Sequence, residues 1–371
     1  MKIAIDAHSI GSKAGGNETF YRQLVRGLAA ESGDHQYHIF YTHAAALETM
    51  PRDPRFSVTR IPQNPIVRNG VALPRLLAAL KPDVFHCQYI KPPLVRAPTV
   101  VTIHDLAHEH YPEHFHPLEG LRMRAMVRAT AQRAEHILTV SHFAARDIAQ
   151  TYRIAPEKIT IAYQAPAAIF RPRDQQQCQQ ELTRRYNLQS PFILYVGRIQ
   201  ARKNLPRLVE AYALARREGI GAQLVIAGPP DWQAQQLLAK IKKLQLEEMV
   251  RLPGYVAHND LPLFFCASEA FVFPSLFEGF GLPVVESMAC GTPVITSHGS
   301  ALEEVAGDAA LLVDPNDVPS ISKAIVRVLS DSNLRKELAG RGLRRSADFH
   351  PQELAHKALE AYALAIRAGQ R

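Results

Sequence analysis

The chain alternates short apolar runs with longer segments that carry apolar residues at helical spacing. Each run has apolar side chains on consecutive positions, and most runs contain two or more β-branched residues. Consecutive apolar positions are typical of parallel strands that helices cover on both faces. The predicted strands lie at 2–6, 38–42, 83–87, 98–103, 136–140, 158–163, 192–196, 222–227, 270–274, 293–297 and 309–313. The pattern therefore predicts an α/β protein with parallel sheets.

Both halves of the chain open with the same unit, which is a strand, a glycine-bearing loop and a helix. The strand at 2–6 is followed by a loop that contains Gly15 and by a helical pattern from Asn17. The strand at 192–196 is followed by a loop that starts at Gly197 and by another helical pattern. Such a unit opens a doubly wound sheet. Two open sheets are therefore favoured over one barrel of eight strand–helix units, which the length would also allow.

The length of 371 residues corresponds to about two domains at roughly 150 residues each. The segment 164–174 (QAPAAIFRPRD) has little periodicity and contains prolines, so we interpret it as the linker between them. The chain from His350 onward predicts one long helix, because apolar residues recur there at helical spacing.

Composition and cysteine spacing indicate an ordinary globular protein. Of the residues, 47% are hydrophobic and 21% are charged, which is typical of domains that bury a core. The four cysteines lie far apart along the chain, which disfavours a disulfide scaffold and a zinc ribbon. Asp6 interrupts the first apolar run too early for a signal peptide, and no run approaches the roughly 18 apolar residues of a membrane span. We therefore expect a cytoplasmic protein.

The chain is basic, with 43 Lys and Arg against 35 Asp and Glu, a net charge of +8 and a pI near 9.3. This balance favours an anionic partner, such as nucleic acid, a phosphorylated substrate or a membrane surface, although a modest excess also occurs without one. The helix predicted at 118–133 carries several arginines. It is either an ordinary amphipathic surface helix or a face for an anionic acceptor or a membrane.

The first candidate site segment, 197–204 (GRIQARKN), follows a predicted strand and precedes a helix. Ligands of open α/β sheets bind beyond the carboxyl ends of strands. Arg198 and Lys203 lie there, and two cations beside a helix N-terminus can neutralise a diphosphate. The alternative is a solvated basic loop.

The second segment, 277–286 (FEGFGLPVVE), combines glycines, a proline and two acids. Gly279 and Gly281 allow the backbone to approach a ligand. Pro283 suits the first turn of a helix, which would place Glu286 in that turn and Glu278 in the loop before it. One carboxylate can bind the vicinal hydroxyls of a ribose and the other the hydroxyls of a second polar group, while helix N–H groups face phosphates. This composition is unusual for a simple capped turn.

Two features of the first half are weaker candidates. Gly15, Gly16 and Asn17 precede a helix and let a ligand lie against the backbone, but a tight turn explains them equally well. His104 follows the strand at 98–103 and begins a run with five histidines, at 104, 108, 110, 114 and 116. Their spacing does not match a helical pair of metal ligands with an acidic partner, so a metal site is disfavoured.

Several familiar motifs are missing from the sequence. The absence of Gly-x-Gly-x-x-Gly disfavours nicotinamide and flavin binding, and the absence of a Walker A sequence excludes a P-loop kinase or ATPase. There is no Gly-x-Ser-x-Gly elbow. There is no Asp-x-Asp pair to hold a metal–diphosphate complex, so Arg198 and Lys203 would have to neutralise the charge. We expect neither a metal nor a cofactor.

The motifs together resemble glycosyltransferase family 4, a group of retaining enzymes with the GT-B fold that use nucleotide sugars. The most specific feature is the pair Glu278 and Glu286 with seven residues between them. The resemblance covers nearly the whole chain. The other segments that carry it are GGN at 15–17, HD at 104–105, TVSHFAARDI at 139–148, YVGRIQARKN at 195–204, the stretch 273–295 and the C-terminal helix. One turn departs from the family, because 164–167 reads QAPA where Asn-Gly-Val-Asp is usual.

The resemblance implies two Rossmann-like domains facing across a cleft. Residues 1–168 would bind the acceptor, 169–349 would bind the nucleotide sugar, and helix 350–371 would pack back on the first domain. Arg198 and Lys203 would stabilise the departing diphosphate. No protein nucleophile is implied, since the donor phosphate can accept the acceptor's proton on the face of attack, with positioning and electrostatics supplying the catalysis.

The resemblance also implies roles for the remaining candidates. Glu286 would bind ribose and Glu278 the donor sugar, while His104 and the loop Gly15–Asn17 would frame the reacting face. The expected catalytic residues are thus Glu278, His104, Arg198 and Lys203. Further donor contacts are expected from Tyr255, Val256, Gly279, Phe280, Gly281 and Leu282.

The expected partners are a UDP- or GDP-linked sugar and a glycan or lipid-linked acceptor, with peripheral contact at the inner membrane face through helix 118–133. Two alternatives stay open at this stage. One is a nucleotide-sugar epimerase or a sugar phosphorylase of the same fold. The other is a basic nucleic-acid-binding module, which a single tryptophan and scattered arginines disfavour.

Overall fold

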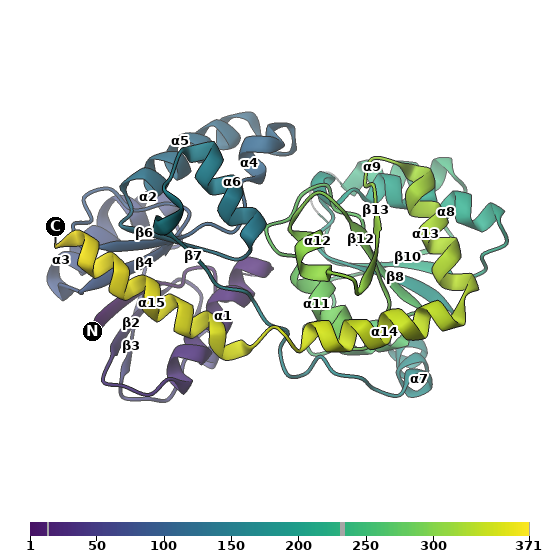
Figure 1. Cartoon of the computed structure of the whole chain (residues 1–371), viewed down its shortest axis with the longest axis horizontal. Coiled ribbons are helices and arrows are strands. Elements are labelled where there is room, and N and C mark those ends of the chain that lie inside the picture. Colours follow the sequence, from purple (N-terminus) through teal and green to yellow (C-terminus); the bar gives the residue numbers. More distant parts are fainter. Residues whose placement is uncertain (13–14, 231–233, 371) are drawn as a thin grey trace. The chain divides into compact units, whose positions relative to one another are not determined.

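The structure is a computed structural model of the chain, and it describes residues 1–12, 15–230 and 234–370 (Figure 1). Contacts divide the chain into two compact units. Unit 1 comprises Met1–Gln164 and His350–Arg371, and unit 2 comprises Ala165–Phe349. The division after Gln164 lies within the predicted linker and just before the expected boundary at 168.

In the described part of unit 1, seven parallel strands form one sheet in the order β3-β2-β1-β4-β5-β6-β7. The strands are β1 Lys2–Asp6, β2 Gln36–Tyr41, β3 Phe56–Arg60, β4 Val84–Gln88, β5 Thr99–Thr102, β6 His136–Thr139 and β7 Ile159–Ile161. The helices are α1 Gly16–Ala30, η1 Ala44–Thr49, α2 Pro65–Val67, η2 Arg68–Ala72, α3 Leu73–Leu80, α4 Ala107–His110, η3 Pro112–His114, α5 Pro117–Arg133, α6 His142–Tyr152, η4 Pro156–Lys158 and α15 Pro351–Gly369.

In the described part of unit 2, six parallel strands form a second sheet in the order β10-β9-β8-β11-β12-β13. The strands are β8 Phe192–Val196, β9 Gln223–Ala227, β10 Val250–Gly254, β11 Ala270–Phe273, β12 Val294–Ser297 and β13 Ala310–Val313. The helices are α7 Gln175–Tyr186, η5 Ala201–Lys203, α8 Leu205–Arg217, α9 Ala234–Lys243, α10 Leu261–Ala267, α11 Leu282–Ala289, α12 Ala301–Ala306, α13 Val318–Ser330 and α14 Ser332–Ser346.

The sequence analysis missed β3 and β10, and both lie at sheet edges. Their side chains are largely half-buried or exposed, whereas β4, β5 and β11 are buried throughout. An edge strand has a neighbouring strand on one side only and needs less apolar cover. The run of consecutive apolar residues that reveals an inner strand is therefore absent from both.

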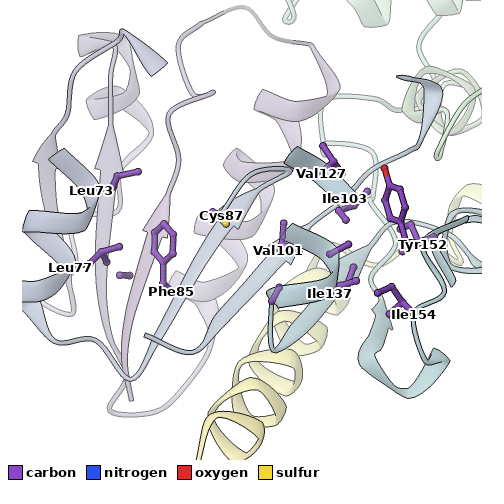
Figure 2. Packing of buried hydrophobic residues seen from close by; sticks show 14 of the residues in the cluster. Leu73, Leu77, Phe85, Cys87, Val101, Ile103, Val127, Ile137, Tyr152 and Ile154 are labelled. Carbon is purple, nitrogen blue, oxygen red and sulfur yellow. The ribbon is translucent and has the colours of Figure 1, made fainter. Parts of the chain in front are cut away.

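Alternate side chains of the unit 1 strands enter different cores. Phe85 and Cys87 of β4 pack with Leu73 and Leu77 of α3 in one buried cluster, which Figure 2 shows. The intervening His86 points to the other face, where its Nδ1 lies 2.7 Å from the hydroxyl of Tyr362 on α15. This alternation is what a strand covered on both faces requires.

Helix α15 belongs to unit 1, although it follows unit 2 in the chain. It runs along the sheet of unit 1 beside α1 (Figure 1). The two helices cross closely at Gly27, where an added Cβ would lie 2.8 Å from the Cβ of Ala355. A glycine at this position allows the close packing.

Each sheet has a point at which the strand order reverses direction. In unit 1 the chain builds outward from β1 on one side and from β4 on the other, and in unit 2 it does so from β8 and from β11. Loops that leave two such neighbouring strands diverge and open a crevice at the carboxyl edge of the sheet. Most candidate residues of unit 2 lie on the loops after β8 and β11 or at the start of α11, and Tyr255 and Val256 follow β10.

Candidate active site

Backbone and amide hydrogen bonds join the loops after β8 and β11 of unit 2. The N–H of Leu276 donates to the carbonyl of Arg202 at 2.8 Å. The buried Asn204 has a φ of 64°, and its Nδ2 donates to the carbonyls of Pro274 at 3.0 Å and Pro315 at 2.6 Å. These hydrogen bonds fix the positions of the two loops relative to each other.

Glu278 is buried beneath two cations from the other loop. Its side chain accepts a hydrogen bond from Nη1 of Arg202 at 3.0 Å and forms an ion pair with Nζ of Lys203. Burial alone would raise the pKa of Glu278, but Arg202 and Lys203 outweigh it and lower the pKa to about 2. The carboxylate is therefore ionised, and Lys203 and Glu278, which the sequence named separately, lie together.

Sequence reasoning missed the role of Arg202. Its Nη1 also donates to the carbonyl of Phe277 at 2.9 Å, so Arg202 holds the loop that carries Glu278. The available signal was the pair of adjacent cations, Arg202 and Lys203, immediately before a helix. The predicted Arg198 lies on the same loop but is exposed, and its carbonyl accepts from the Tyr195 hydroxyl at 3.3 Å.

Glu286 lies in a very different environment. It is 5% exposed, and no side chain or backbone group among the described residues forms a hydrogen bond or ion pair with its carboxyl group. Burial raises the pKa of Glu286 to about 8, so the group is largely protonated at pH 7. The sequence analysis placed Glu286 in the first turn, but the helix already begins at Leu282, so Glu286 falls in the second turn.

The glycine-rich stretch between Glu278 and Glu286 leads into α11, and the residue just before the helix has a left-handed backbone conformation. Gly281 has a φ of 95°, and an added Cβ would lie 2.3 Å from Cδ2 of Leu302. The Phe280 ring is buried edge-on against Phe349 at 5.6 Å between ring centroids. Phe280 can therefore present only its backbone to a ligand, and Gly279 and Leu282 are buried on either side.

Tyr255 and Val256 follow β10, and they differ in exposure. Tyr255 is 56% exposed and Val256 is 6% exposed. Since β9 lies between β10 and β8, this pair is farther along the carboxyl edge than the Arg202–Glu278 pair. An exposed aromatic ring there can stack on a planar group.

In unit 1 the glycine loop and His104 both lie at the carboxyl edge of the sheet. Gly15 has a φ of 62°, and neither Gly15 nor Gly16 has an atom within 4 Å of an added Cβ. Asn17 is in the first turn of α1. His104 is 6% exposed and packs edge-on against Phe20 at 4.8 Å, and its Nε2 has no hydrogen-bond partner among the described residues. Burial lowers the pKa of His104 to about 4, so the ring is neutral.

Two other histidines of the run, His108 and His110, have hydrogen-bond partners within unit 1. His108 lies 3.0 Å from the Tyr152 hydroxyl, and His110 lies 2.7 Å from Asp147. Among the described residues, no three His, Cys, Asp or Glu side chains are placed to hold a metal ion. These histidines tie loops and helices together.

Some arginines of helix α5 form hydrogen bonds within unit 1. Nε and Nη2 of Arg124 donate to the carbonyls of His108 and Glu109 at 3.0 and 2.8 Å. Arg122 is exposed, and so are Leu118 at 76% and Leu121 at 67%. In the described part of the chain, no helix has the length and apolar character needed to cross a membrane.

Comparisons with known proteins find relatives of both units. The family model described as glycosyl transferases group 1 matches residues 179–345, and that described as glycosyltransferase family 4 matches residues 14–165. The chain is 34% identical over 267 residues to O-antigen chain mannosyltransferase B of Escherichia coli, which covers 71% of this chain and 70% of that protein. It is 30% identical over 256 residues to the serotype-specific mannosyltransferase WbdA of Escherichia coli, but this match spans 65% of the chain and 30% of that longer protein.

A solved structure shows the same fold. HepE of Anabaena in complex with UDP-glucose matches with a TM-score of 0.77 at 18% identity, over 98% of this chain and 99% of that chain. The two parallel-sheet units thus confirm the predicted GT-B fold. With both halves matched by family models and a relative aligned over most of its length, the chain belongs to glycosyltransferase family 4.

Proposed function

We propose that this glycosyltransferase transfers a hexosyl unit from a nucleoside-diphosphate sugar to a hydroxyl of a glycan or lipid-linked acceptor, with retention and without a metal ion. The observation that carries the proposal is the pair of buried acids in unit 2. Glu278 is ionised beneath Arg202 and Lys203, whereas Glu286 is protonated and has no partner among the described residues. The two acids therefore offer different hydrogen-bonding properties to one ligand.

Lys203, Arg198 and the neighbouring Arg202 are proposed to bind the diphosphate. Glu278 pairs with both Lys203 and Arg202, which leaves one positive charge, so a diphosphate would share these cations with it. As the anomeric carbon–oxygen bond breaks, the departing diphosphate gains charge, and cations already in place stabilise it. Backbone N–H groups of Gly279 to Leu282 can add to this at the start of α11.

Glu286 is proposed to bind the ribose. A protonated carboxyl group donates one hydrogen bond and accepts others, which matches the two vicinal hydroxyls. Glu278 is proposed to hold hydroxyls of the transferred sugar, and Tyr255 and Val256 are proposed to contact the base. Mannose is the sugar to test first, because two relatives are named as mannosyltransferases.

Unit 1 is proposed to bind the acceptor. It corresponds to the expected acceptor domain 1–168 together with helix 350–371. His104 and Gly15 to Asn17 lie at the carboxyl edge of its sheet, where ligands of such sheets bind. The exposed Leu118 and Leu121 beside Arg122 support contact with an anionic membrane surface, since apolar side chains and cations together favour that interface. A cytoplasmic enzyme at the inner face would meet a lipid-linked acceptor there.

The test combines ligand binding with product analysis. GDP-mannose, UDP-glucose and UDP-N-acetylglucosamine, with their free diphosphates, are screened by thermal shift. A ligand at 100 Kd should stabilise the protein by about 2.7 kcal/mol. NMR of the product should show a new glycosidic bond with the anomeric configuration of the donor, formed equally in the presence of EDTA.

Each other outcome contradicts a stated part of the proposal. An inverted product would exclude retention, and activity lost in EDTA but restored by magnesium would exclude metal independence. An isomerised or phosphorylated sugar in place of a glycoside would favour an epimerase or phosphorylase. Binding of oligonucleotides but of no nucleotide sugar would refute the proposed donor.

A further inference from the structure

The ammonium group of Lys203 lies over an aromatic ring that the proposed function does not involve. Its Nζ is 5.0 Å from the centroid of the Phe273 ring. Phe273 is the last residue of β11, and Lys203 ends η5, the short helix that follows β8 in the chain. A cation this close to the face of an aromatic ring is attracted by the electron density of that face. The ring is therefore a second partner of Lys203, in addition to Glu278.

Burial makes this contact stronger than a similar contact at the surface. The Lys203 side chain is 12% exposed, and Phe273 is fully buried. The attraction between a cation and an aromatic ring grows when both are removed from water, because water no longer competes for the cation. A ring without exposed surface cannot itself touch a ligand. Any effect of Phe273 on donor binding must therefore act through Lys203 or through the stability of the fold.

Two further rings fix the orientation of Phe273. Tyr195 of β8 stacks on it with ring centroids 5.6 Å apart and 17° between the ring planes. Phe271 of β11 stacks on it at 5.5 Å and 22°. Stacked aromatic pairs at this separation attract each other beyond the burial of their area. The Phe273 ring therefore has little freedom to tilt away from Lys203.

Tyr195 also holds the loop that carries Lys203. Its hydroxyl donates to the carbonyl of Arg198 at 3.3 Å. A Cβ added at Gly197 would lie 2.7 Å from this hydroxyl, so glycine at that position leaves room for it. One side chain thus contacts both the start of the loop and the ring on which Lys203 lies.

The ring holds Lys203 without cancelling its charge. Glu278 also holds Lys203, but its negative charge reduces the attraction that the cation exerts on a diphosphate. A phenylalanine ring has no net charge and leaves that attraction in place. Lysine has a flexible stem of four carbons, and ordering it at the moment of binding would lower the affinity for a ligand. A lysine that is already ordered on Phe273 avoids this loss.

We propose that Phe273 is a positioning residue for Lys203, which it holds in place to bind the diphosphate of the donor, and that Tyr195 supports Phe273 in this role. This inference rests on the proposed function, in which Lys203 binds the diphosphate. It adds two buried aromatic residues to those that determine donor affinity. A residue of the core alone would affect stability, but its effect on diphosphate binding would not depend on Lys203.

The binding test measures the affinity for UDP and GDP by calorimetry. Trifluorophenylalanine in place of Phe273 keeps the shape of the ring but withdraws electron density from its face, and it should weaken binding about fivefold. Phe273→Leu removes the ring and should weaken binding about tenfold. Neither change should weaken binding further in a Lys203→Met background, because a residue that acts through Lys203 has no effect once that charge is gone. Phe264→Leu is the matched control: Phe264 of α10 is fully buried and packs on Tyr186, and its loss should leave the affinity unchanged.

The spectroscopic test needs no ligand. In protein that contains carbon-13-labelled lysine, NMR should show the protons at the end of the Lys203 side chain at unusually high field, because they lie over the face of the Phe273 ring. Phe273→Leu should abolish this shift. Lys203→Met removes the resonance and so identifies it.

The outcomes separate this inference from the proposed function. An affinity within twofold of wild type in the trifluorophenylalanine protein would overturn the positioning role of Phe273. An equal loss with and without Lys203, or Lys203 protons at ordinary field, would also overturn it, and all three outcomes leave the donor site standing. Failure of the wild type to bind either UDP or GDP would instead refute the proposed donor, and the NMR result would still decide whether Phe273 holds Lys203.

Discussion

Replacing Glu278 with glutamine tests whether its carboxylate holds the two site loops together. The change keeps the size of the side chain but leaves Arg202 and Lys203 without a counter-charge. The pKa of Glu278 falls from 4.5 to about 2 in the folded protein. At about 1.36 kcal/mol per pKa unit, the carboxylate contributes about 3 kcal/mol at neutral pH. We expect Glu278→Gln to lower the free energy of unfolding of unit 2 by about that amount at pH 7.

The pH dependence has a defined sign. A carboxyl group whose pKa is lowered by folding stabilises the protein above its unfolded pKa and loses that contribution as the pH falls through the folded value. The stability difference between wild type and Glu278→Gln should therefore be complete at pH 7 and shrink between pH 4.5 and pH 2. Urea unfolding followed by circular dichroism at pH 7 and pH 3 measures it, and a nucleoside diphosphate identifies the transition of unit 2 by shifting it.

Glu337→Gln is the matched control, because it removes a charge from the same unit at the surface. Glu337 is 53% exposed and pairs with Arg341 one turn along α14, and such pairs contribute less than about 1 kcal/mol. The reasoning is refuted if Glu278→Gln unfolds within about 0.5 kcal/mol of wild type at pH 7. It is also refuted if the difference does not shrink at pH 3.

Three further changes test other parts of the structure. Glu286→Gln should weaken nucleoside-diphosphate binding in calorimetry. Because burial raises the pKa of Glu286 to about 8, the wild type should lose stability as the pH rises from 4.5 to 8, and urea unfolding of Glu286→Gln should not show this loss. Gly281→Ala should lower the melting temperature by at least the equivalent of about 1 kcal/mol, since φ is 95° and the new Cβ would meet Leu302 at 2.3 Å; an unchanged value would contradict this. Tyr362→Phe leaves Nδ1 of the buried His86 unpaired and should reduce the urea stability of unit 1 by about 1–3 kcal/mol, whereas equal stability would show that the bond contributes nothing.

The inner strands of both sheets could be predicted because burial on two faces leaves consecutive apolar residues. The edge strands β3 and β10 could not, because polar residues, and in β10 a proline, interrupt their apolar positions, whereas the edge strands β7 and β13 lie in more continuous apolar runs. Helix α15 was predicted from its periodicity, but its place in unit 1 came from family resemblance. Periodicity gives no information on which unit a helix packs against.

The two acids could be found from the sequence because their spacing is local. The pairing of Arg202 with Glu278 could not, since it joins residues 76 positions apart and depends on how the loops after β8 and β11 meet. The same holds for the contrast between the acids. Burial and partners make one carboxyl ionised and the other protonated, and neither property is visible in the letters E-x7-E.

The membership of α15 in unit 1 affects the order in which the chain can fold during synthesis. The ribosome releases β1 to β7 first, then all of unit 2, and only then α15. Until α15 emerges, one face of the unit 1 sheet is covered by α1 but not by α15, and His86 lacks the hydroxyl of Tyr362. Unit 2 is contiguous in the chain and can complete its core earlier. The half of the protein that is made first therefore finishes folding last, and its exposed sheet face is a point at which a chaperone could bind the nascent chain.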